Sequence, residues 1–173
     1  MFDKSKVGQS FPPFTIEVER GKIRELALAI GDDNPIYQSK ENAQAAGYPD
    51  VPLYPTAPTM FAFWGNRKMV GQLASLGINL MRVLHGEEEY EYLAPIYPGD
   101  TLTGEMKLVD AKLRPTQGGS MDLLTIEIDY TNQHGTLVLK ARFGLRRDPL
   151  TSCGADELLP AKMLLLPSAN WPT

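Results

Sequence analysis

Residues 29–37 read Ala-Ile-Gly-Asp-Asp-Asn-Pro-Ile-Tyr, and this short stretch organises the interpretation of the whole chain. It follows an amphipathic run, so the pattern predicts a helix that ends at Gly31 and then turns sharply. The turn presents the carboxylate of Asp32 beside the amide of Asn34. The last position of the stretch, where a general base would help most, holds Tyr37. A neutral phenol with a pKa of about 10 is a poor base at pH 7. The stretch therefore carries a carboxylate but lacks the general base that would complete a catalytic pair.

The composition describes a single folded domain. The chain has 173 residues, of which 43% are hydrophobic, and its formal net charge is −4. This weak negative charge argues against nucleic acid as a partner, because phosphate binding needs a concentrated basic surface. A lone cysteine, Cys153, allows no internal disulfide, and its Ser/Gly/Pro-containing surroundings disfavour a nucleophile. Because no secretory signal or membrane-length apolar run is found, we expect a cytoplasmic protein with no membrane partner.

The N-terminal half predicts short helices joined by turns. Phe14, Ile16 and Val18 alternate with polar residues, as in a short strand. A helix follows, with apolar residues at i, i+3, i+4 and i+7. Ser39 can cap a second short helix, and residues 48–58 form a Pro-rich loop. The next helix begins near Pro58 and is apolar nearly all round, so we expect it to be buried; its large apolar residues are Met60, Phe61, Phe63 and Trp64.

The C-terminal half predicts β-strands. The segments around 90–92, 102–113, 124–130 and 137–145 carry apolar residues at every second position, and residues 132–135 make a hairpin loop. One-sided alternation indicates an antiparallel sheet with one covered face. The natural cover is the apolar helix. We therefore expect an α+β fold in which an antiparallel sheet wraps around a long central helix.

The order of these elements resembles the hot dog fold of the MaoC-like hydratases and dehydratases, over roughly residues 7–147. The family motif is Gly-Asp-x-Asn-Pro-aliphatic-His, and Tyr37 replaces its His. The segments 57–60 and 84–87 are similar to the N-terminal-type MaoC dehydratase branch. The matching residues are Gly31, Asp32, Asn34, Pro35 and Ile36 of the motif, with Tyr92, Pro95, Pro98, Gly99 and Asp100 further along. In that branch a second hot dog domain or subunit commonly supplies the acid/base pair.

The resemblance implies four candidate catalytic residues, and each has a structural alternative. Asp32 takes part in the chemistry or shapes its loop as an Asx turn. Asn34 contacts substrate or fixes the turn. Tyr37 donates a hydrogen bond to substrate or fills the space of the missing imidazole. His85 is a catalytic histidine or a structural one, whereas His134 sits in the hairpin tip and is expected to face solvent.

The candidate substrate-binding residues lie around the start of the central helix. In the family, water adds to an enoyl thioester or is removed from a hydroxyacyl thioester. Stabilising the enolate in this reaction needs backbone N–H groups aimed at the thioester oxygen, and a helix N-terminus offers them. Thr59 and Met60 are the candidates for this role. The full substrate-binding set is Tyr54, Pro58, Thr59, Met60 and Phe63. Coenzyme A or an acyl-carrier protein would need basic residues at the groove mouth, for which the candidates are Arg67, Lys68, Arg82 and Arg114.

No cofactor is expected. Two isolated histidines and one cysteine do not give a zinc signature, and no Walker-type phosphate loop is found. Residues 1–147 form the predicted domain. Residues 148–173 form a Pro-containing extension that either packs on this domain or clasps a second subunit.

Three functions remain open. The first is a subunit of an R-specific enoyl-thioester hydratase or 3-hydroxyacyl-thioester dehydratase with a degenerate site and a catalytic partner. The second is an acyl-CoA thioesterase, and the third is a non-catalytic subunit that binds acyl groups. An uncovered sheet edge predicts a dimer in each case, either of identical chains or with a second MaoC-like subunit.

Overall fold

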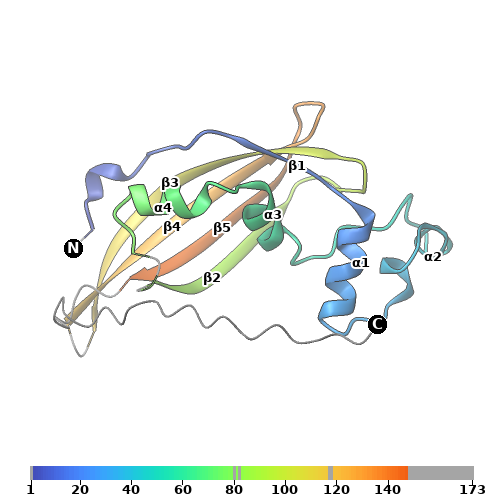
Figure 1. The fold of residues 1–173 in the computed structure, drawn as a ribbon, viewed down its shortest axis with the longest axis horizontal. Coiled ribbons are helices and arrows are strands. Elements are labelled where there is room, and N and C mark those ends of the chain that lie inside the picture. The colour runs from blue at the N-terminus through green and yellow to red at the C-terminus, as the bar shows by residue number, and fades with distance from the viewer. Residues whose placement is uncertain (1, 80, 82, 117–118, 148–173) are drawn as a thin grey trace, which may run out of the picture.

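The computed structural model describes residues 2–79, 81, 83–116 and 119–147 (Figure 1). Two expectations therefore lie outside the described residues: the role of Arg82, and the packing of the extension 148–173, which includes Cys153.

A five-stranded antiparallel sheet forms the framework. Its strands are β1 (Phe14–Glu17), β2 (Val83–Tyr92), β3 (Thr101–Thr116), β4 (Gly119–Thr131) and β5 (Leu137–Arg147). Their order in the sheet is β1-β3-β4-β5-β2, and every pair is antiparallel. The short β1 and the long β2 are therefore the two edge strands.

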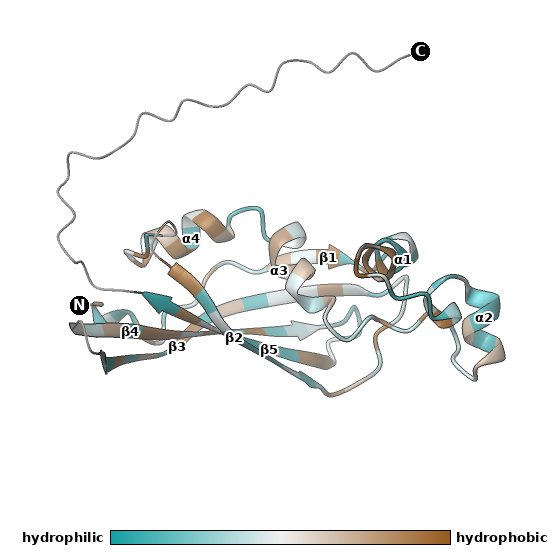
Figure 2. Cartoon of the chain, turned by 90° about the horizontal axis from the view of Figure 1, so that it is seen from below, coloured by the Kyte–Doolittle hydropathy of each residue, from teal (hydrophilic) through white to brown (hydrophobic). Residues whose placement is uncertain are grey.

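Three of the four described α-helices lie on one side of this sheet. The helices are α1 (Arg20–Ala29), α2 (Lys40–Ala45), α3 (Pro58–Gly65) and α4 (Met69–Ser75), with the 3-10 helices η1 (Lys4–Lys6) and η2 (Pro35–Tyr37). Figure 2 shows α1, α3 and α4 on the same side of the sheet, with α2 beyond its end. This arrangement confirms the predicted α+β fold. Among the described helices, none combines the length and the apolar character that a bilayer crossing requires.

The core lies between α3 and the inner face of the sheet. Tyr130 of β4 is fully buried at its centre. Its ring makes edge contacts with Phe14 of β1 and Phe61 of α3, each at a centroid separation of 5.9 Å. Gly104 of β3 pairs with Phe14, and a Cβ there would lie 2.5 Å from the Phe14 ring. The missing side chain therefore lets this ring pack closely against β3.

The helical cover differs from the expectation in two respects. It is divided into α3 and α4, with the buried Asn66 between them donating to the side chain of Gln72 at 2.7 Å. The expectation that α3 is buried on all sides is wrong, because Phe63 is 61% exposed and Trp64 is also exposed. Only the stripe of Pro58, Phe61 and Ala62 faces the sheet. A helix that lies across one sheet face buries one stripe, and the opposite stripe stays open.

An ion pair centred on Asp50 connects α1 and α2 to the loop that follows them. Arg20, the first residue of α1, donates to both carboxylate oxygens of Asp50, at 3.0 and 2.7 Å. Lys40 of α2 lies 3.5 Å from the same carboxylate. The hydrogen bonds from Arg20 and the Val51 N–H lower the pKa of Asp50 to about 2. This bidentate contact ties α1 to the loop that leads to α3.

Candidate active site

The motif loop, residues 31–37, is held by hydrogen bonds of its polar side chains. α1 ends at Ala29, and Gly31, which follows the C-cap residue Ile30, has a φ of +76°. Asp32 then accepts the Asn34 N–H at 2.9 Å through Oδ1 and the Tyr54 hydroxyl at 3.0 Å through Oδ2. Asn34 in turn accepts the Ile36 N–H at 3.2 Å and caps η2. Both oxygens of the Asp32 carboxylate therefore stabilise the loop.

Tyr37 packs against Tyr54 beside the motif loop, and its hydroxyl does not become a base. Its ring lies against Tyr54, with centroids 4.8 Å apart and planes at 51°. Burial, followed by the neighbouring Tyr54 and Asp32, raises the pKa of Tyr37. The hydroxyl therefore stays neutral at pH 7. Tyr92, at the end of β2, donates to the Pro55 carbonyl at 2.9 Å and brings this strand end to the loop.

Tyr54→Phe tests whether Asp32 has this structural role. The substitution removes one of two hydrogen bonds to the carboxylate, so we expect a loss of about 0.5–1.5 kcal/mol in the free energy of unfolding, measured by urea denaturation. Tyr48→Phe is the matched control, because Tyr48 is exposed in the same loop and its removal should change the free energy by less than about 0.5 kcal/mol. Equal losses in both variants would contradict the assignment.

The start of α3 does not offer the free donors that the sequence suggested. The Thr59 N–H donates to the Thr56 carbonyl at 3.3 Å, and the Met60 N–H donates to the Ala57 carbonyl at 2.9 Å. Pro58 is fully buried, which removes its side chain from contact with a ligand. In this structure the Thr59 and Met60 N–H groups are therefore already engaged by carbonyl oxygens.

His85 lies far from the motif loop. It is near the start of β2, whereas Tyr92 reaches the loop from the end of the strand. Seven residues of strand separate them, which corresponds to roughly 20 Å. The structure therefore does not bring His85 to Asp32. His134 is exposed in its hairpin, as predicted, and Asp33 is exposed in the motif loop.

His85 belongs to a second polar cluster, which the sequence analysis missed. Its Nε2 lies 3.7 Å from Oε2 of Glu88, and its ring stacks on Phe143. Thr59 of α3 donates to the same Glu88 oxygen at 3.0 Å and shares a short hydrogen bond with the Tyr90 hydroxyl. Burial, followed by Glu88, raises the pKa of Tyr90. We call Thr59, His85, Glu88 and Tyr90 the strand cluster.

Three members of the strand cluster line an apolar pocket of about 300 Å³. The pocket lies between the helices α3 and α4 and the strands β2 and β5. Its polar wall consists of Thr59, His85 and Glu88. The rest of the lining is apolar: Ala62, Phe63, Met69, Val70, Leu73, Val83, Phe143 and Leu145. Two predicted substrate-binding residues, Thr59 and Phe63, are thus brought together with one predicted catalytic residue.

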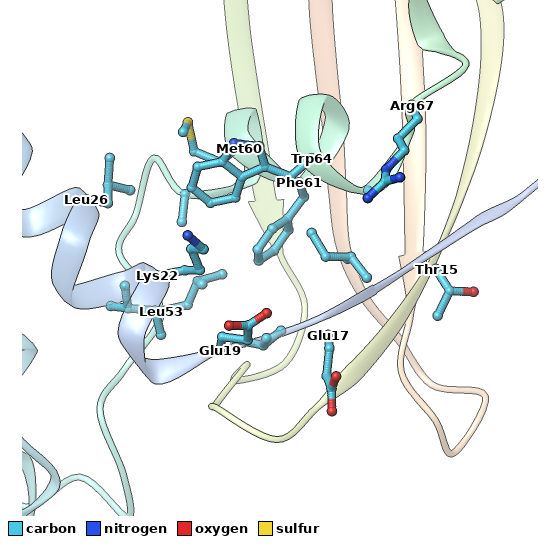
Figure 3. Close-up of a pocket in the computed structure, with 15 residues that line it drawn as sticks. Thr15, Glu17, Glu19, Lys22, Leu26, Leu53, Met60, Phe61, Trp64 and Arg67 are labelled. Atoms are coloured by element: carbon cyan, nitrogen blue, oxygen red, sulfur yellow. The ribbon is translucent and has the colours of Figure 1, made fainter.

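A second pocket, of about 410 Å³, lies between α1, β1 and α3 (Figure 3). Met60, Trp64 and Arg67 line it, and the Lys22 ammonium lies 5.5 Å from the centre of the Trp64 ring. The structure thus separates Met60 from Thr59 and Phe63. The other basic candidates, Lys68 and Arg114, are exposed. Within the described residues, no three His, Cys, Asp or Glu side chains are grouped to hold a metal ion.

Comparison with known proteins places the chain in a family. The model of the FAS1-like dehydratase domain region matches residues 5–141. The chain belongs to this dehydratase family. A MaoC-like dehydratase of known structure is 27% identical, with a TM-score of 0.69; the match covers 83% of this chain and 42% of that longer one. The predicted MaoC-like assignment and hot dog fold are thereby confirmed.

Two further proteins are similar to this member of the family. A chain of the C-terminally truncated HadBC complex of Mycobacterium tuberculosis, a 3R-hydroxyacyl-ACP dehydratase, has the same fold, with a TM-score of 0.69 at 22% identity. That match covers 82% of this chain and 96% of the other. A UPF0336 protein of Streptomyces avermitilis is 45% identical over 105 residues, which are 58% of this chain and 67% of the relative.

Proposed function

We propose that this chain is a subunit of an R-specific enoyl-thioester hydratase or 3-hydroxyacyl-thioester dehydratase, and that a second hot dog unit supplies the catalytic Asp–His pair. One observation carries the proposal: both oxygens of Asp32 accept structural hydrogen bonds, one from the Asn34 N–H and one from the Tyr54 hydroxyl, and a neutral Tyr37 stands where the family has its imidazole. General acid–base catalysis works best with a group whose pKa lies near the operating pH, and the raised pKa of Tyr37 keeps its hydroxyl from replacing the missing imidazole.

Among the described residues, the edge of β2 that faces away from β5 pairs with no strand, and this edge and the helix stripe beside it suit the second unit. Phe63 of α3 and Val70 of α4 are exposed apolar side chains beside β2, and both line the same pocket. An exposed apolar patch beside an unpaired strand edge is typical of an association surface. The HadBC relative is a complex by its name. This chain covers only 42% of the longer MaoC-like dehydratase, which leaves room there for a second unit of similar size.

The apolar pocket suits the acyl chain of a thioester. Its volume of about 300 Å³ lies at the lower end of the range for small-molecule sites. Phe63 and Val70 belong both to its lining and to the exposed patch. A partner that covers this patch would therefore close the pocket and shield the reaction from water.

The test is reconstitution with a MaoC-like partner that carries the complete Gly-Asp-x-Asn-Pro-x-His motif. We expect the purified chain alone to hydrate crotonyl-CoA little, as followed by the absorbance of the enoyl group. The assembled pair should turn it over, and a change of the partner's motif histidine should abolish this activity.

Three results would contradict the proposal. Substantial turnover by the lone chain, abolished by Asp32→Ala, would show that its own loop is catalytic. Release of free thiol from crotonyl-CoA would indicate a thioesterase, because hydration leaves the thioester bond intact. Thermal stabilisation by acyl-CoA without turnover in any pairing would indicate a subunit that only binds acyl groups.

A further inference from the structure

We propose that His85 is the group of this chain that binds the thioester oxygen as negative charge develops on it, and that Glu88 is its positioning residue. This inference rests on the proposed function and adds a site to it. The strand cluster lies outside the motif loop, in the wall of the pocket that would hold the acyl chain.

The first argument is the occupancy of the alternative donors. In dehydration, a base removes the C2 proton and the electron pair moves onto the thioester oxygen. The electron pair then returns from the oxygen to form the C2=C3 double bond, while the carbon–oxygen bond at C3 breaks and the hydroxyl leaves as water with a proton from the acid. The oxygen needs a hydrogen-bond donor while it carries this charge. The Thr59 and Met60 N–H groups already have carbonyl acceptors.

The second argument is the position of His85. Its side chain is 51% exposed, while that of Glu88 is only 21% exposed. The imidazole therefore stands at the mouth of the pocket and the carboxylate lies deeper in its wall. An acyl chain inside the pocket places its thioester at the mouth. In its charged form, the imidazole has two N–H donors, of which one can face Glu88 and the other the thioester oxygen.

The third argument is the way Glu88 is fixed. Thr59 donates to it from α3, and Tyr90 is hydrogen-bonded to Thr59 from the same strand as Glu88. Two secondary-structure elements thus hold the carboxylate in place. On its other side, the His85 ring stacks on Phe143, with centroids 6.3 Å apart. A donor held on rigid elements needs little reorganisation when the charge develops.

The test measures initial rates of crotonyl-CoA hydration by the assembled pair. Loss of one oxyanion donor typically lowers kcat by about 10²–10³-fold, so we expect this loss in His85→Leu, with KM within about threefold of the wild type. His85→Gln keeps an N–H donor and should retain more activity than His85→Leu. Glu88→Gln should lower kcat with little effect on KM. His134→Gln is the matched control, because His134 is exposed in a hairpin, and it should leave the rate unchanged.

The outcomes separate this inference from the proposed function. If the pair is active and His85→Leu and Glu88→Gln both keep kcat within threefold of the wild type, the role of the strand cluster is overturned and the proposed function stands. If both variants raise KM and leave kcat unchanged, the cluster binds substrate only, and the inference is also overturned. If no pairing turns over an enoyl thioester, the inference about His85 and the proposed function are both overturned. His85→Gln keeps the test decisive should the leucine variant not fold.

Discussion

Phe63→Asp is expected to separate this chain from its partner while leaving it folded. Phe63 is 61% exposed on α3, so the substitution removes little from the core. In the assembly, an aspartate would bury an unpaired charge in an apolar contact. Interface aromatic residues of this kind contribute about 2 kcal/mol or more, so the dissociation constant should rise at least about 30-fold. Sedimentation velocity of the mixture measures this directly.

Leu28→Asp is the matched control for this prediction. Leu28 is 57% exposed on α1, a helix that does not border β2. The same change of an exposed apolar residue to a carboxylate should leave assembly intact. If Phe63→Asp still assembles with the wild-type affinity, or if Leu28→Asp disrupts assembly equally, the face formed by α3 and β2 is not the contact surface.

Phe61→Ala is expected to have the largest effect on stability. Phe61 is 5% exposed, and its ring meets that of Tyr130 at the centre of the sheet. Truncation of a buried phenylalanine costs about 3–5 kcal/mol, out of a total stability of about 5–15 kcal/mol for a typical domain. Urea denaturation of the isolated chain should show the loss as a lower midpoint.

Phe63→Ala provides the comparison, because the two residues are neighbours on one helix. In the isolated chain it should change the free energy of unfolding by less than about 0.5 kcal/mol, since its side chain is mostly in solvent. Similar losses from both substitutions would mean that α3 is not anchored through the stripe that contains Phe61.

The strands were the most predictable part of the fold. In β4 and β5, apolar residues occupy every second position, and the structure buries them on one face. Period-two alternation fixes both the strand and the face that it covers. The end of α1 was also predictable, because Gly31 adopts a positive φ that suits a helix end.

The exposure of α3 could not be predicted from its composition. The apolar side chains of α3 indicate burial, but they do not distinguish burial against the chain's own sheet from burial against another subunit. Phe61 meets Tyr130, whereas Phe63 points away from the core. The difference depends on which side of the helix faces the sheet, and only the fold determines that.

The motif loop was partly predictable, and the strand cluster was not. The Asx turn of Asp32 was expected from the local sequence, but its bond to Tyr54 joins residues 22 positions apart. Glu88 belongs to a run of three glutamates, a pattern that indicates solvent exposure. The register shift between His85 and Glu87 changes the alternation along β2, and Glu88 then lies beneath α3 beside Thr59. Sequence separation hides such a contact.

The activity of Asp32→Asn in the assembled pair tests the central claim most directly. The substitution keeps the size of the side chain and an oxygen that can accept the Asn34 N–H, but it removes the carboxylate. If this loop only shapes the subunit, kcat/KM for crotonyl-CoA hydration should stay within about threefold of the wild-type pair. A loss of more than about 100-fold, on the scale of a lost catalytic acid or base, would show that Asp32 itself takes part in the reaction.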